Sequence, residues 1–255
     1  MEKNVTGKFD IQVGDVLIVK GKTSTSKILS IAQKVLYWKN TSSHVLISFS
    51  DGFYIHSTGD KGVHLISFKE LLPEIEPNFK AIRLKNLTSD KVDNLRMSIN
   101  YYLNQKYNKR FFTEQSGASF CSELVAKTYH KAFIEIFGGK HSSFVTPADF
   151  EREADLNGDW LDITIPTIKK FVEFINVGKE YDLAYFHLKN ILDTRKRLIV
   201  YRNQLHQMMT NSDYFSEKMR NEYDRIQKVM APKLRALNWD DIHAKYYKSY
   251  IYKMK

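Results

Sequence analysis

Cys121 is the only cysteine in the 255-residue chain, and it stands in the segment FCSELVAKTY at positions 120–129. Ser119 is a candidate N-cap, so the pattern predicts that Cys121 lies in the first turn of a helix. There the unpaired backbone N–H groups and the helix dipole favour a thiolate over a thiol. A single cysteine is more often a small buried hydrophobic residue, so a catalytic role requires a base within hydrogen-bond distance of the sulfur.

His44 and His56 are the candidates for that base and for the group that orients it. They stand in HVLISF and FYIHS, two predicted strands that are joined by SDG at positions 50–52. A three-residue loop with its glycine at positive φ pairs Phe49 with Phe53 and puts both histidines on one face, with Cβ atoms about 7 Å apart. A two-residue loop would put them on opposite faces. The loop therefore predicts a histidine pair, although each histidine alone could equally be a structural residue.

The elements that must position these residues form a mixed α+β region that ends near residue 165. Short runs of β-branched and aromatic residues predict strands at 16–19, 45–49, 53–57, 63–66 and 81–84. Helical spacing of apolar residues predicts helices at 26–38 and 89–102, and a third from Cys121 to a stop before Gly138. Thr146, as N-cap before Pro147, predicts a fourth.

The remaining residues, 166–255, are predicted to form an all-helical extension, with helices at 181–209, at about 215–230 and at 239–252. The chain has a net charge of +10; residues 181–255 hold 15 Lys and Arg against 8 Asp and Glu, a net +7. Such an excess is typical of proteins that bind anionic lipid or nucleic acid, and also of ordinary solvated surfaces. An anionic membrane surface is the partner that we expect for this segment, and nucleic acid stays open as the weaker alternative.

Six segments of the sequence resemble a known group. They are GDVLIV at 14–19, SHVLISF at 43–49, DGFYIHST at 51–58, KYN at 106–108, FCSELV at 120–125 and TPADF at 146–150. Their order is similar to that of the circularly permuted papain-like enzymes of the NlpC superfamily, in which histidine precedes cysteine. The resemblance is to the YiiX/YaeF-type amidases and covers residues 11–152. It implies a permuted papain-like (NlpC-type) domain with an antiparallel sheet packed on helices.

The resemblance also implies roles for individual residues. Cys121 would be the nucleophile, His44 the base and His56 the third polar residue. YiiX-like members commonly have glutamate at this third place, whereas the His, His, Cys order, with the histidines twelve positions apart, is similar to that of lecithin:retinol acyltransferase and its relatives. Three residues in or beside the matched motifs are the candidates for substrate binding: Ser43, Tyr107 and Ser122.

We therefore expect a cysteine-dependent hydrolase or acyltransferase that cleaves an amide or ester bond through a thioester. The expected substrate is a lipid-like acyl group or a peptide amide; the alternatives are a cell-wall-type peptide amidase and a non-catalytic module that binds through the helical extension. No cofactor is expected, and a metal site is not, because the sequence has no HExxH and a lone cysteine cannot build a thiolate cage. With no secretory signal or spanning segment visible, we expect a cytoplasmic protein that can associate with a membrane surface.

Overall fold

The computed structural model describes residues 10–22, 34, 36–156, 158–211 and 216–235. The chain divides into two compact units. The first ends at Gly178 and the second begins at Lys179. The boundary predicted after residue 165 falls inside a helix of the first unit, and the predicted helices at 26–38 and 239–252 lie wholly or mostly outside the described residues.

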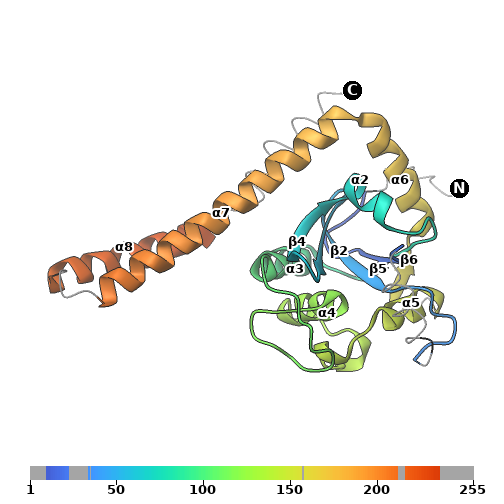
Figure 1. Cartoon of the computed structure of the whole chain (residues 1–255), viewed down its shortest axis with the longest axis horizontal. Helices are drawn as coiled ribbons and strands as arrows, with labels where there is room; N and C mark the ends of the chain where they lie inside the picture. The colour runs from blue at the N-terminus through green and yellow to red at the C-terminus, as the bar shows by residue number, and fades with distance from the viewer. Residues whose placement is uncertain (1–9, 23–33, 35, 157, 212–215, 236–255) are drawn as a thin grey trace, which may run out of the picture. The chain divides into compact units, whose positions relative to one another are not determined.

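The first unit is built on an antiparallel sheet (Figure 1). Its strands run in the order β4-β3-β2-β1-β5-β6. Their bounds are β1 Val16–Val19, β2 His44–Ser50, β3 Phe53–Thr58, β4 Gly62–Ser67, β5 Lys80–Leu84 and β6 Trp160–Asp162. The first five confirm the predicted strands to within a residue or two at each end. β6 was not predicted, because three residues are too few to show a period.

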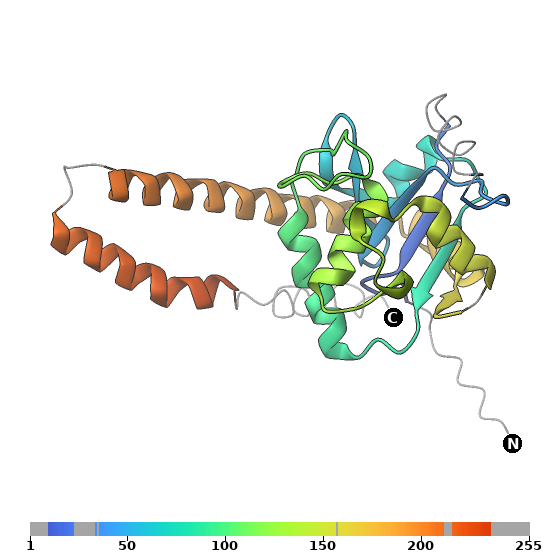
Figure 2. The same cartoon turned by 90° about the horizontal axis from the view of Figure 1, so that it is seen from below.

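Helices lie on both faces of this sheet, and most residues of β1 to β4 are buried. The helices of the unit are α2 Phe68–Leu71, α3 Ser89–Tyr102, α4 Cys121–Lys131, α5 Pro147–Leu156 and α6 Thr164–Val177, with 3-10 turns at η2 Leu72–Glu74, η3 Phe137–Gly139 and η4 Ser142–Phe144. α3 and α4 lie side by side (Figure 2), and α4 contacts β2 and β3. On α6, Phe171 stacks on Phe68 of α2. The predicted α+β class and antiparallel sheet are confirmed.

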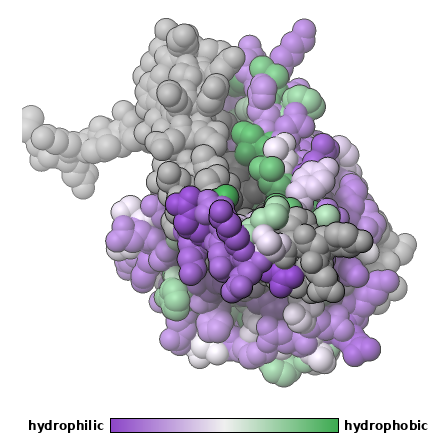
Figure 3. Space-filling model, turned by 90° about the vertical axis from the view of Figure 1, so that its left-hand side faces the viewer, coloured by the Kyte–Doolittle hydropathy of each residue, from purple (hydrophilic) through white to green (hydrophobic). Residues whose placement is uncertain are grey.

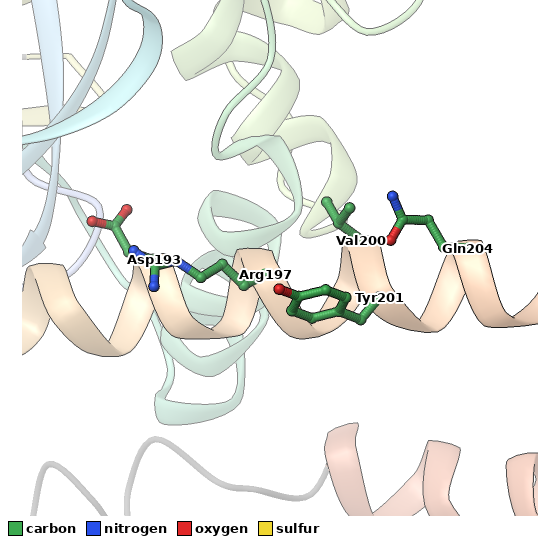
Figure 4. Close-up of a pocket in the computed structure, with 5 residues that line it drawn as sticks. All are labelled: Asp193, Arg197, Val200, Tyr201 and Gln204. Atoms are coloured by element: carbon green, nitrogen blue, oxygen red, sulfur yellow. The ribbon is translucent and has the colours of Figure 1, made fainter.

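The second unit is helical as far as it is described. It contains α7 Lys179–Asn211 and α8 Glu217–Arg235, which confirm the first two helices predicted for the extension. Five residues of α7 line a surface hollow (Figure 4): Asp193, Arg197, Val200, Tyr201 and Gln204.

Hydrophilic residues make up most of the described surface in Figure 3, with smaller hydrophobic patches between them. Within the described residues, no helix combines the length and the apolar character needed to cross a membrane.

Candidate active site

The β2–β3 hairpin brings the two predicted histidines to one face, but its turn differs from the prediction. Ser50 pairs with Phe53, so the turn has two residues, and Gly52 takes a φ of 77° in it. The predicted pairing of Phe49 with Phe53 is therefore wrong. The register shifts between Ser48 and Ser50, and beyond that bulge Ile47 pairs with Ile55. A classic bulge adds one residue to one strand, so it reverses the effect of the shorter turn and restores the predicted face.

The predicted histidine pair is confirmed by its geometry. His44 Nε2 lies 2.9 Å from His56 Nδ1, and the two rings meet edge to face with their centroids 5.1 Å apart. His56 is 2% exposed, whereas His44 is partly accessible. A partly accessible imidazole that is held by a buried one has the arrangement expected of a base and its orienting group.

A third histidine, which the sequence analysis did not identify, extends the pair. His64 lies opposite His56 in the β3–β4 ladder, and its Nε2 is 3.0 Å from His56 Nε2. Its other ring nitrogen, Nδ1, is 2.9 Å from the carbonyl oxygen of Gly62. The signal was present in the sequence, because a hairpin that turns between Thr58 and Gly62 necessarily places His64 across from His56.

All three imidazoles resist protonation. Burial, together with the neighbouring His64, lowers the pKa of His44 to about 4. Burial, followed by the neighbouring imidazoles, lowers the pKa of His56 well below its ordinary value, and burial also lowers the pKa of His64. The three rings are therefore neutral near pH 7, and each carries a single N–H.

Cys121 opens α4, as predicted, but its N-cap is Phe120 rather than Ser119. Ser119 is fully buried, and its hydroxyl donates to Gln105 Oε1 at 3.1 Å instead of capping the helix. Its carbonyl oxygen accepts a hydrogen bond from Ser57 Oγ at 2.6 Å, which ties the start of the helix to β3. The carboxylate of Glu123 accepts from the backbone N–H of Phe120 at 3.1 Å and caps the first turn.

The thiol of Cys121 is buried, with 7% exposure, and burial raises its pKa. Hydrogen bonds from the backbone N–H groups of Val45, Ser122 and Cys121 itself act in the opposite direction without reversing the shift. The expectation that the helix end favours a thiolate is therefore wrong for the resting protein, because desolvation outweighs the N–H groups. Since Val45 follows His44 in β2, its hydrogen bond also fixes the sulfur beside the strand that carries the candidate base.

A buried charge cluster supports the start of α4. Glu123 is 0% exposed, accepts from Asn108 Nδ2 at 3.0 Å and pairs with Lys127 Nζ at 2.7 Å. Lys127 also donates to the carbonyl oxygen of Ala118 at 3.2 Å. Asn108 belongs to the predicted KYN motif, so this motif braces the nucleophile helix. The sequence alone assigned no supporting role to Glu123 and Lys127, because a buried Glu–Lys pair is identical in sequence to an exposed i,i+4 pair.

The segment before His44 is held by α5, which the TPADF motif begins. Glu151 accepts hydrogen bonds from the backbone N–H groups of Thr41 and Ser42 at 2.9 and 2.8 Å, and from Thr41 Oγ1 at 2.8 Å. Burial acts to raise the pKa of Glu151, but the hydrogen bonds from Ser42 and Thr41 hold it below its usual range. This contact fixes the entry of the chain into β2.

The three candidate substrate-binding residues have different surroundings. Ser43 and Ser122 are buried, and both hydroxyls have backbone partners: Ser43 Oγ accepts from Gly21 N at 3.2 Å, and Ser122 Oγ donates to Val145 O at 2.7 Å. Tyr107 is partly exposed. Burial, and then Cys121 and Glu123, raise the pKa of Tyr107, so its hydroxyl keeps its proton near pH 7 and can donate a hydrogen bond. Substrate binding by these residues stays a prediction.

Exposed aromatic side chains lie next to the start of α4. Phe111 and Phe112 are 46% and 56% exposed, and Phe144 of η4 is 49% exposed. The Phe111 ring packs against Phe120, the residue before Cys121, with centroids 5.3 Å apart, and Phe112 stacks with Phe144 at 6.2 Å. We call these three residues the aromatic patch.

In the described part of the chain, no group of three or more His, Cys, Asp or Glu side chains is arranged to hold a metal ion.

Two comparisons with known proteins found similarity to this chain. The family model of the permuted papain-like amidase enzymes, the YaeF/YiiX or C92 family, matches residues 10–143. The crystal structure of the metalloprotein yiiX from Escherichia coli O157:H7 is 21% identical, with a TM-score of 0.41, over 49% of this chain and 67% of that chain. No curated protein matches the chain significantly.

Proposed function

Because the chain belongs to the YaeF/YiiX (C92) family of permuted papain-like amidases, we propose that it cleaves an amide or ester acyl bond through a thioester on Cys121. The observation that carries the proposal is the hydrogen-bonded pair of His44 and His56 on β2 and β3. His44 directly precedes Val45 in β2, and the backbone N–H of Val45 donates a hydrogen bond to the Cys121 sulfur. This arrangement supports a reaction in which Cys121 is the nucleophile, His44 the base and His56 the orienting group.

In the proposed reaction the resting pair is a neutral thiol and a neutral imidazole. His44 takes the proton from Cys121 as the sulfur attacks the substrate carbonyl, and the tetrahedral oxyanion is stabilised by backbone N–H groups at the start of α4. The protonated His44 then gives that proton to the leaving amine or alkoxide as the carbon–heteroatom bond breaks. Water or an acceptor alcohol or amine, deprotonated by His44, resolves the thioester and regenerates the thiol.

The proposed substrate class is a lipid-like acyl group. The aromatic patch supports it, because Phe111 packs on the residue that precedes Cys121 and, with Phe112, is substantially exposed. Exposed aromatic side chains beside a reacting centre are suited to binding an acyl chain. Peptide amides remain the alternative substrate class, with the same chemistry at the carbonyl.

Mass spectrometry of Cys121 after incubation of the protein with a cell extract tests this proposal. We expect an acyl mass on Cys121 in the wild type, no adduct in Cys121→Ala, and no turnover by that variant although its fold is retained. A peptidyl mass would support the amidase alternative. A Cys121→Ala variant that remained fully active would reject the enzyme proposal and leave a non-catalytic binding module.

We also propose that residues 181–255 bind an anionic membrane surface. Their net charge of +7 and the exposed apolar side chains of α7, among them Leu198, Leu205 and Met208, support this role. Helices that combine basic and apolar surface bind at lipid interfaces.

A further inference from the structure

The three histidines form a hydrogen-bonded chain that ends on a backbone carbonyl. The carbonyl oxygen of Gly62 can only accept a hydrogen bond, so the hydrogen at the 2.9 Å contact belongs to His64 Nδ1. Each of the other two contacts joins two ring nitrogens, and either nitrogen could be the donor. The Gly62 contact is therefore the one point at which the direction of the whole chain is decided.

Once that end is fixed, the remaining hydrogens follow from the chemistry of the neutral imidazole, which has one donor and one acceptor nitrogen. His64 uses its N–H on Gly62, so its Nε2 must accept from His56 Nε2–H. The Nδ1 of His56 must then accept from His44 Nε2–H. His44 therefore carries its hydrogen on Nε2, and its Nδ1 has none. Of the two ring nitrogens of His44, Nδ1 is also the one that makes no contact with His56.

We propose that His64 is a positioning residue that, anchored on the Gly62 carbonyl, sets the tautomers of His56 and His44 so that His44 Nδ1 is free to accept the thiol proton of Cys121. The inference rests on the proposed function and goes beyond it, since it assigns to a third histidine the orientation of the base. A carboxylate beside the base can only accept and so fixes the tautomer by itself. An imidazole at the same place can also donate, and in the reversed direction His44 would carry its hydrogen on Nδ1 and could not act as the base.

The backbone around Gly62 holds the carbonyl group that accepts from His64. Gly62 has a φ of 67°, and a Cβ atom at this position would lie 2.2 Å from the carbonyl oxygen of Gln105. Val63 N donates to Gln105 O at 2.8 Å, and Asn104 N donates to Val63 O at 2.8 Å, so the strand end is held against the neighbouring segment. Only glycine fits both the left-handed conformation and this close approach. The carbonyl that receives the His64 N–H is thus kept in place.

The first test determines the tautomers directly. We expect nitrogen-15 NMR of ring-labelled wild-type protein at pH 7.5 to find the hydrogen on Nδ1 of His64 and on Nε2 of His56 and His44. Resonances are assigned by single His→Gln variants. A hydrogen on His44 Nδ1 in the wild type would overturn the inference without the need for any further variant.

The second test combines kinetics with the same spectra. With p-nitrophenyl octanoate as the probe, we expect His64→Ala to lower kcat about tenfold to a hundredfold at unchanged KM, as the base loses its preferred tautomer. His64→Gln keeps an acceptor within reach of His56 Nε2 and should recover part of the rate. His130→Gln, at an exposed histidine near the end of α4, is the matched control. The variants leave Lys61, Asp60 and Glu74, the charged groups that act on His64, in place.

The outcomes separate this inference from the proposed function. If His64→Ala keeps both the wild-type kcat and the wild-type ring spectra of His44 and His56, His64 has no positioning role, even though the enzyme proposal stands. If Cys121→Ala hydrolyses the ester at the wild-type rate, the proposed function itself fails.

Discussion

The sheet of the first unit and helix α7 of the second unit differ in how far their apolar side chains are buried. In the first unit, the strand residues Leu17, Leu46 and Ile55 are 0% exposed, and helices cover the sheet that they form. On α7 of the second unit, Leu198 and Met208 are 56% and 59% exposed. The apolar residues of the central strands thus build a closed core, whereas several apolar side chains of α7 are exposed at the surface.

The difference separates a region suited to chemistry from a region suited to recognition. Burial in the first unit lowers the pKa of His44 and raises that of Cys121, so the fold itself controls the protonation of the candidate catalytic groups. In the second unit, exposed apolar and basic side chains give a surface suited to a partner rather than to a reaction.

The largest expected effect is the loss of the buried partner of the base. We expect His56→Ala to lower kcat by about 10²–10⁴-fold with little change in stability, because His44 would no longer be held in a reactive orientation. His56→Glu should retain part of the rate, since a carboxylate can accept the His44 Nε2–H. Steady-state kinetics with p-nitrophenyl octanoate and thermal melts of the three proteins give the measurement.

A structural role for His56 predicts the reverse result. If His56→Ala keeps the wild-type kcat and only melts at a lower temperature, the histidine pair is part of the core and not of a catalytic site.

The sequence was sufficient to predict most of the elements that carry the site. β1 Val16–Val19 and α3 Ser89–Tyr102 have the predicted bounds, because their composition and period are clear. α2 Phe68–Leu71, β6 Trp160–Asp162 and α6 Thr164–Val177 were not predicted as separate elements. α2 and β6 are too short to show a period, and β6 pairs with β5 from a distant part of the chain.

The site itself was predicted only in part, for two physical reasons. The pairing of His44 with His56 depends on a bulge near Phe49 that compensates for a two-residue turn, and no local residue type signals such a bulge. The protonation of Cys121 depends on how deeply α4 is buried against β2 and β3, whereas position in a helix reveals only the favourable dipole. Register and burial are both tertiary properties.

A second prediction concerns the surface of the helical unit. We expect the full-length protein to bind vesicles that contain anionic lipid, with an affinity that falls as salt is raised. Replacing three exposed lysines of α7 and α8 by glutamine should weaken binding about tenfold or more, because each contributes up to about 1 kcal/mol near such a surface. The three are Lys189, Lys218 and Lys228.

A matched control substitutes as many exposed lysines in the first unit: Lys91, Lys109 and Lys169. This variant has the same net charge, so equal losses for the two variants would show a general charge effect and reject a membrane-binding helical unit. Removal of residues 181–255 should abolish most of the binding, and vesicle binding that is unaffected by this truncation would contradict the proposal. Nucleic acid that competes with the vesicles would favour the alternative partner.

The smallest expected effect is a pH dependence of stability that comes from His44. Its pKa is lowered from 6.5 to about 4 in the folded protein. Between these pH values, His44 is therefore protonated in the unfolded chain and neutral in the folded chain. The contribution of His44 to stability is therefore complete above pH 6.5 and is lost as the pH falls towards 4. Burial raises the pKa of Asp51 to about 6, which acts in the opposite direction, so the wild type alone does not isolate the histidine. We expect His44→Gln to lose less stability than the wild type between pH 7.5 and pH 5 in urea unfolding, whereas His187→Gln, at an exposed histidine of α7, should behave as the wild type does. Equal losses in all three proteins would mean that the burial of His44 does not govern its protonation, and the contrast between the two units would then not extend to their titration.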